Sequence, residues 1–111
     1  IIMKTFCFDL DGVICTNTWG NYKEAKPISK SIKKINLLFD EGNNIIIFTS
    51  RFMTKCEGDI TKVNKVGYDF TYNQLKSWDL KFNKLILGKP SYDMIIDDKS
   101  FNYSDDWIKE I

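Results

Sequence analysis

The sequence contains no histidine at all among its 111 residues. This absence excludes the Ser-His-Asp and Cys-His catalytic arrangements, zinc sites that depend on histidine, and any histidine general base. An enzyme with this composition has to work with carboxylates, lysine, hydroxyl groups or a metal ion held by oxygen ligands. The range of possible mechanisms is therefore narrow before any motif is considered.

Arginine is almost absent as well. Arg51 is the only one, and lysine supplies the rest of the 16 basic residues. Because acidic residues number 15, the net charge is +1, a balance that gives no general attraction to nucleic acid or to an anionic membrane. Two interpretations of Arg51 stay open: a contact with the phosphate or sugar of a substrate, and a structural salt bridge.

Cysteine is scarce and shows no pairing pattern. Cys7, Cys15 and Cys56 are odd in number and form no CxxC pair, which predicts reduced thiols in a cytoplasmic protein rather than disulfides or a zinc knuckle. We expect Cys7 and Cys15 to be buried packing residues. No apolar run approaches the roughly 20 residues of a membrane span, and residues 1–3 are too short for a signal peptide.

The length and the 43% hydrophobic content are sufficient for one hydrophobic core. Neither the short polar segment 16–27 nor any connection between later elements has room for an inserted domain. We therefore expect a single domain over residues 1–111, without a cap domain, and with an open site.

Short apolar runs alternate with segments of helical periodicity. Helical spacing with Pro27 at its start and Gly42 at its end predicts a helix between them. A shorter helix over 57–66 should end at Gly67, and Thr71 is a candidate cap for another. The apolar runs predict four strands, at 4–9, 45–48, 84–87 and 94–97. This alternation predicts an α/β fold, a Rossmann-like parallel sheet in three layers with helices on both faces.

Each predicted strand ends in polar residues, and the carboxyl ends of parallel strands share the edge where such folds bind ligands. We therefore expect one cleft to be formed by residues that are far apart in the sequence. Its members are Asp9, Asp11 and Gly12 after the first strand, Thr49, Ser50 and Arg51 after the second, Lys89 after the third, and Asp97 and Asp98 after the fourth.

Clustered carboxylates repel one another unless a cation is present, and oxygen ligands suit Mg2+. With Mg2+ and Lys89 in place, the cleft becomes a site for an anion, and phosphate fits it well. Asp9 and Asp11 point to the same side if the backbone stays extended. One could attack phosphorus while the other handles the proton, and Gly12 permits a sharp turn beside them.

The chain resembles the haloacid dehalogenase superfamily over nearly its whole length. The four motifs of that superfamily match Phe6–Val13, Ile45–Arg51, Gly88–Pro90 and Ile95–Asp98, in that order. In detail, the chain is similar to small capless members that act as capsule or polysaccharide biosynthesis phosphatases. It departs from the pattern at Val13, where many phosphatases of the family have threonine.

The resemblance implies a role for each matched residue. Asp9 would be the nucleophile and a Mg2+ ligand, and Asp11 the general acid/base, with its backbone carbonyl on Mg2+. Thr49 would bind the phosphoryl group, and Lys89 would hold the nucleophile and phosphate. Asp98 would be the direct metal ligand and Asp97 its neighbour in the outer shell, or the two would have these roles in the reverse order. Ser50, Arg51 and Gly12 are the predicted substrate contacts.

The function that this resemblance implies is a Mg2+-dependent phosphatase that works through an aspartyl-phosphate. Its substrate would be a small phosphorylated molecule such as a phosphosugar or cell-surface precursor. The alternatives are a polynucleotide-end phosphatase, which the net charge disfavours, and a phosphate-binding regulatory domain without turnover. We expect no membrane partner, whereas a second copy of the chain or a partner enzyme could enclose the site. Trp19 and Tyr22 would form either a flap over the site or, more in keeping with their surroundings, a small separate cluster.

Overall fold

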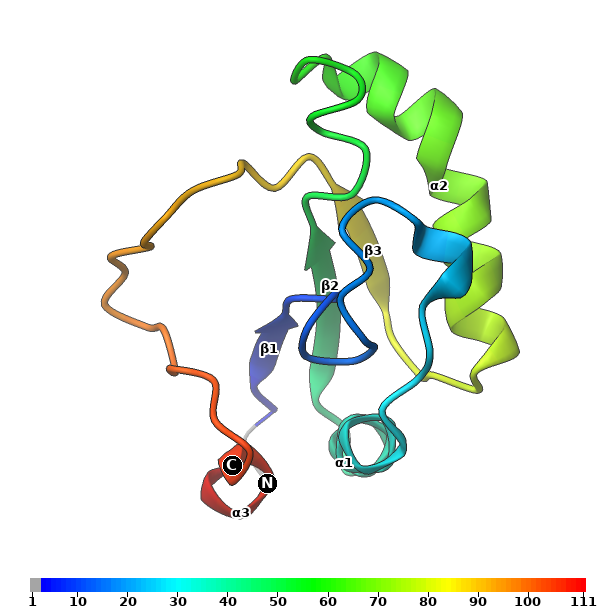
Figure 1. Ribbon diagram of the computed structural model, residues 1–111. Helices are drawn as coiled ribbons and strands as arrows, with labels where there is room; N and C mark the ends of the chain where they lie inside the picture. The colour runs from blue at the N-terminus through cyan, green and yellow to red at the C-terminus, as the bar shows by residue number, and fades with distance from the viewer. Residues whose placement is uncertain (1–2) are drawn as a thin grey trace.

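A parallel sheet of three strands forms the centre of the protein, in a computed structural model that describes residues 3–111 (Figure 1). Ile1 and Ile2, part of the segment judged too short for a signal peptide, lie outside the described residues. The strands are β1 (Thr5–Phe8), β2 (Asn44–Thr49) and β3 (Lys84–Leu87), and they lie in the order β1-β2-β3. All three agree with the apolar runs that predicted them.

The two faces of the sheet differ in how well they are covered. The pairing places Ile47 beside Phe8 and Leu85, and these three side chains are at most 7% exposed. Cys7 and Ile86 lie on the opposite face and are exposed. Residues of all three helices belong to the core that includes the buried face. The structure is thus an α/β fold in which one sheet face is largely buried, consistent with a small Rossmann-like arrangement.

Helix α1 (Ser29–Asp40) connects β1 to β2 and confirms the helix predicted after Pro27. Ile32, Ile35 and Leu38 recur at helical spacing and all three are buried, which places one apolar stripe of the helix in the core. Packing of this stripe against the sheet explains why the segment is helical despite its several polar residues.

Helix α2 (Ile60–Ser77) runs unbroken through the region where two short helices were predicted. The prediction that Gly67 ends a helix was therefore wrong, as was the prediction that Thr71 begins one; Thr71 is buried in the middle of α2. Asp59 caps the helix instead, since its side chain accepts a hydrogen bond from the Lys62 N–H. Gly67 does not end a helix because this position needs a glycine for tertiary packing.

Gly67 gives Phe52 room to pack directly on α2. A Cβ at position 67 would lie 2.6 Å from Cε2 of Phe52 and closer still to Cδ2. Phe52 itself has a φ of 69°, a left-handed conformation that a bulky residue rarely adopts. The close approach of ring and helix backbone requires a residue without a side chain.

Gly67→Ala should therefore destabilise the protein even though alanine is the better helix former. Helix propensity favours alanine by about 1 kcal/mol, but displacing the packed Phe52 ring should cost about 1–3 kcal/mol. We expect a lower melting temperature, measured by circular dichroism, whereas Lys65→Ala at an exposed site of the same helix should leave it unchanged or slightly higher. A melting temperature raised by Gly67→Ala would contradict this account of α2.

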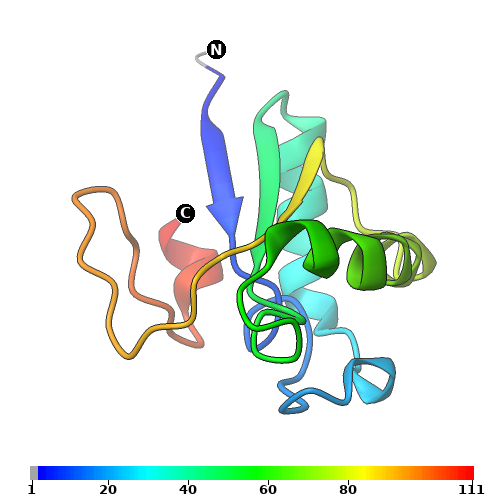
Figure 2. The ribbon, with the colours of Figure 1, turned by 90° about the horizontal axis from the view of Figure 1, so that it is seen from above.

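The segment that follows β3 does not form the predicted fourth strand. Met94–Asp97 contains no strand, and Met94 and Ile96 are 77% and 92% exposed. Figures 1 and 2 show the chain swinging outward beyond β1 after β3 and returning to the short helix α3 (Trp107–Glu110). Apolar composition alone predicted this strand, but a strand also needs a neighbour to pair with. Here the chain diverges from the sheet after Gly88, whose φ is 102°.

Helix α3 closes the chain beside β1. Trp107 is 2% exposed, and its ring lies 5.5 Å from that of Phe8. Of the helices in the described part of the chain, none is long and apolar enough to cross a membrane.

Candidate active site

A tight turn directly after β1 presents two carboxylates. Leu10, between them, is completely buried, and its carbonyl accepts hydrogen bonds from the N–H groups of Ile14 and Cys15, at 2.9 and 3.3 Å. Gly12 has a φ of 90°, which glycine adopts without strain. The side chains of Asp9 and Asp11 are 41% and 17% exposed, so both carboxylates reach the surface from a firmly anchored turn.

Asp9 and Lys89 form an ion pair at the carboxyl ends of β1 and β3. The ammonium Nζ lies 3.4 Å from Oδ1 of Asp9, and the same oxygen accepts the Leu10 N–H at 2.9 Å. The Lys89 backbone N–H donates to the carbonyl of Thr49 at 3.1 Å, which ties this residue to the end of β2. The predicted convergence of these strand ends is thus present, and Oδ2 of Asp9 accepts no hydrogen bond from the described residues.

Competing influences act on the Lys89 ammonium. Burial acts to lower its pKa, but the Asp9 carboxylate and the Tyr92 hydroxyl outweigh burial, and the pKa is raised above its ordinary value. The ring of Tyr92 also lies 5.3 Å from Nζ. Lys89 is therefore a fixed positive charge beside the most exposed carboxylate of the site, which is the electrostatic arrangement that an anion requires.

Arg51 binds the other carboxylate. Its Nε and Nη2 each lie 2.9 Å from an oxygen of Asp11, the parallel two-bond geometry that lysine cannot form. The arginine side chain is 0% exposed. Of the two interpretations left open by the sequence, the structure favours the salt bridge, because the guanidinium is not accessible to a substrate.

Gln74 and Tyr22 hold Arg51 from behind; sequence reasoning missed Gln74 and considered Tyr22 only for a flap or a separate cluster. Gln74 of α2 accepts from Nη1 at 2.6 Å, and the guanidinium lies 4.7 Å from the centre of the Tyr22 ring. Gln74 also donates to the backbone carbonyl of Tyr22 at 2.8 Å, which joins the helix to the short 3-10 helix η1 (Tyr22–Glu24). No sequence signal marks Gln74, since its role depends on where α2 packs.

Thr49 lies at the end of β2, as predicted, but is only 1% exposed. Its Oγ1 accepts the backbone N–H of Arg51 at 3.1 Å, so the hydroxyl helps to shape the turn that orients this arginine. Ser50 is less buried than Thr49. Of the two predicted hydroxyls, Ser50 is the more accessible to a bound anion.

Asp97 and Asp98 are not brought to the other site residues. Both are exposed, and the Asp97 side chain accepts only from the Lys99 N–H among the described residues, at 2.9 Å. Within residues 3–111 there is no group of three acidic or cysteine side chains that could hold a metal ion. The magnesium ligands implied by the sequence are therefore not assembled as the chain stands, with Asp9 and Asp11 at one place and the later pair at another.

Two cysteines lie near the site, one buried and one exposed. Burial, followed by the nearby Asp11 carboxylate, raises the pKa of the Cys15 thiol to about 12. The neutral thiol lies 3.4 Å from Oδ1 of Asp11 and 3.6 Å from Nη2 of Arg51, so it helps to fill the space around that pair. Cys7 is exposed rather than buried as expected, because it lies on the less covered face of the sheet.

A hollow of about 320 Å³ lies beside the site, lined by Trp19, Gly20, Tyr22, Phe52, Thr54 and Lys55. Trp19 is 88% exposed, whereas the Tyr22 ring packs 4.9 Å from that of Phe52. Tyr22 thus belongs to a small aromatic cluster, as favoured, but Trp19 does not fold into it. The hollow adjoins the candidate site through Tyr22, whose ring also contacts Arg51.

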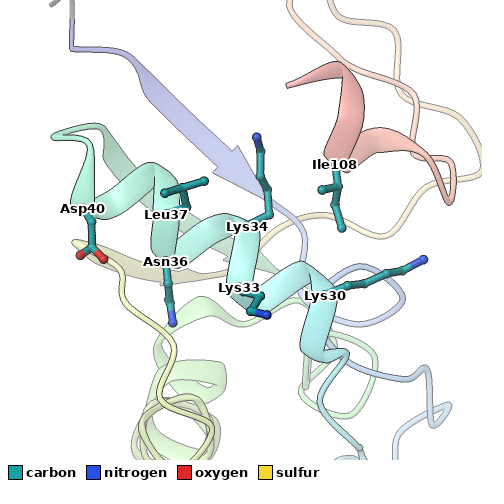
Figure 3. Close-up of a pocket in the computed structure, with 7 residues that line it drawn as sticks. All are labelled: Lys30, Lys33, Lys34, Asn36, Leu37, Asp40 and Ile108. Atoms are coloured by element: carbon teal, nitrogen blue, oxygen red, sulfur yellow. The ribbon is translucent and has the colours of Figure 1, made fainter.

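A larger hollow, of about 610 Å³, lies elsewhere on the molecule. Figure 3 shows that it is bordered by α1 and α3, with three lysines of α1 around it, and that it contains no predicted site residue. This hollow is open to solvent and is lined mainly by polar side chains of α1. The convergence of charged groups at the strand ends, rather than the size of a hollow, identifies the candidate active site.

Comparison with known proteins adds a likeness of fold. No family model and no curated protein matches the chain. A crystal structure of a structural genomics target from Vibrio cholerae is similar, with a TM-score of 0.82 and 24% sequence identity, over 97% of this chain and 95% of that one. At this identity the likeness is one of fold alone. An experimentally determined protein therefore shares the arrangement described here over nearly its whole length.

Proposed function

We propose that the protein is a phosphomonoesterase of the haloacid dehalogenase type that forms an aspartyl-phosphate on Asp9. The observation that carries the proposal is the Lys89–Asp9 ion pair of 3.4 Å beside Asp11, on the edge where three parallel strands end. An exposed carboxylate next to a fixed ammonium can receive a phosphate dianion, and the second carboxylate lies two residues away.

The first step would be attack of Oδ2 of Asp9 on phosphorus. Oδ1 is engaged by Lys89 and the Leu10 N–H, which leaves Oδ2 as the free oxygen. The bond from Oδ2 to phosphorus forms while the bond from phosphorus to the ester oxygen breaks. Asp11, in its protonated form, gives its proton to that leaving oxygen.

The second step would regenerate the enzyme. A water molecule attacks phosphorus of the aspartyl-phosphate, and the Asp11 carboxylate takes a proton from that water. Asp9 leaves as a carboxylate, and inorganic phosphate is released. Both oxygens of Asp11 accept from Arg51, which holds the carboxylate in a fixed orientation beside Asp9.

The substrate we propose is a small phosphorylated molecule such as a phosphosugar or a cell-surface precursor, as the resemblance implies. The three-layer arrangement typical of the superfamily is part of the same proposal. A screen of sugar phosphates, nucleotides and phosphorylated acids tests it, with phosphate release as the measurement. Release from none of these compounds would reject the phosphatase and favour the regulatory alternative.

Mg2+ is the cofactor that the proposal implies, and it would supply charge neutralisation at the phosphate. We expect phosphate release to fall to background after treatment with a chelator and to return on addition of Mg2+. Asp98 lies apart from Asp9 and Asp11, so Asp98→Asn tests the ligand role that the resemblance implies. A higher Mg2+ concentration for half-maximal activity than in Asp105→Asn, at another exposed site of the same region, would assign Asp98 to the metal, and an unchanged concentration would exclude it. Full activity in the presence of chelator would contradict the magnesium requirement.

A further inference from the structure

Arg51 occupies a position that needs explanation beyond charge balance. Its side chain is fully buried, whereas the Asp11 side chain that it binds is 17% exposed. Removing an ion pair from water costs free energy that the attraction between the charges often only offsets, so such pairs are weak evidence for stabilisation. The two-bond geometry does, however, fix both the position and the plane of a carboxylate.

Arg51 is itself held on several sides. Gln74 accepts a hydrogen bond from Nη1, and the guanidinium lies over the Tyr22 ring. The Thr49 hydroxyl accepts the backbone N–H of Arg51. These contacts come from α2, from η1 and from the end of β2, three elements that meet only in the folded chain. Arg51 is therefore a rigid support for Asp11, and the Asp11 carboxylate is the exposed member of the pair.

One position on Asp11 stays available. Each carboxylate oxygen can accept at two positions; the arginine uses one on each oxygen, and the Cys15 thiol, 3.4 Å away, uses the second on Oδ1. The free position on Oδ2 can then carry the proton that a leaving group takes in the first step and that water supplies in the second. Correct alignment of this position matters most when the leaving group is a strong base.

We propose that Arg51 is a positioning residue that holds Asp11 in the orientation for general acid–base catalysis, and that Gln74 keeps Arg51 in place. This inference rests on the phosphatase function proposed above. In this inference Arg51 acts on the reaction only by positioning Asp11 and does not contact the substrate.

The test is the dependence of kcat/KM on the leaving group, because that parameter reports the first step. For Arg51→Met we expect a fall of about 100-fold with alkyl phosphates, near the lower limit of general acid catalysis, and a much smaller fall with 4-nitrophenyl phosphate. Gln74→Leu should show the same pattern more weakly. If Arg51→Met fails to fold, Gln74→Leu alone carries the test.

A double-mutant cycle provides the matched control. In an Asp11→Asn background, Arg51→Met should cause no further loss of kcat/KM for alkyl phosphates, because the group that it positions is already absent. Equal losses for good and poor leaving groups, or additive losses in the cycle, would overturn the inference and leave Arg51 as a structural residue. A wild-type protein without turnover of any phosphate ester would instead overturn the proposed function.

Discussion

Asp9→Asn should abolish phosphate release from every substrate that the wild-type protein turns over. The amide cannot form the acyl-phosphate bond, and loss of a nucleophile typically costs at least about 10⁴-fold in kcat. The site should otherwise stay intact, since asparagine is the same size and can still accept the Leu10 N–H that Oδ1 accepts now. The measurement is phosphate release from 4-nitrophenyl phosphate under single- and multiple-turnover conditions.

A matched control is available on α2. Asp69 is exposed and lies in the middle of the helix, so Asp69→Asn removes the same charge without touching the site. Its kcat should equal that of the wild type, and the melting temperatures of both variants should stay close to the wild-type value.

Mass spectrometry after rapid acid quenching tests the intermediate directly. One phosphoryl group should be found on the peptide that contains Asp9 in the wild type, and none on that peptide in Asp9→Asn. Wild-type turnover by Asp9→Asn, or a phosphoryl group on another residue, would reject the assignment of Asp9.

Local sequence patterns predicted the helices and strands correctly where tertiary packing favours the same conformation as the local sequence. The three strands of the sheet are short apolar runs bounded by polar turns, and α1 has an apolar stripe with a start and a stop signal. Gly67 misled the prediction because its lack of a side chain serves Phe52, 15 residues earlier in the chain, and not the end of a helix. The strand predicted at Met94–Asp97 failed because pairing depends on a neighbour that a single segment does not reveal.

In the candidate site too, some contacts follow from strand order and others depend on how the side chains pack. Parallel strands bring their carboxyl ends together, so the meeting of Asp9 with Lys89 follows from strand order alone. The partner of Arg51 does not follow from strand order, because Gln74 and Tyr22, which contact the guanidinium bound to Asp11, come from elements outside the sheet. Sequence patterns therefore predicted that residues following β1, β2 and β3 gather at one edge, but they wrongly placed Asp97 and Asp98 there and did not predict which residues face a substrate.

Lys89→Met should lower kcat/KM by about 10²–10³-fold, the loss typical of removing one preorganised group that stabilises charge in the transition state. The effect is expected on binding and on the chemical step, because Nζ lies 3.4 Å from the attacking carboxylate and would contact the phosphoryl oxygens as well. Lys89→Arg should recover part of the loss, since it keeps the charge. Lys84→Met, at the other and exposed end of the same strand, should have no effect on kcat/KM.

The pH dependence of the wild type provides a second measurement of the same group. Because the pKa of Lys89 is raised above its ordinary value of 10.5, the ammonium persists through the neutral and moderately alkaline range. Its contribution to folding stability is fully present below that ordinary value and is lost only as the pH rises through the higher pKa of the folded state. Deprotonation of Lys89 should therefore cause no loss of activity between pH 7 and 9.

A kcat/KM unchanged in Lys89→Met would contradict the role proposed for this residue. It would show that the ammonium organises the turn at Asp9 without taking part in phosphate binding.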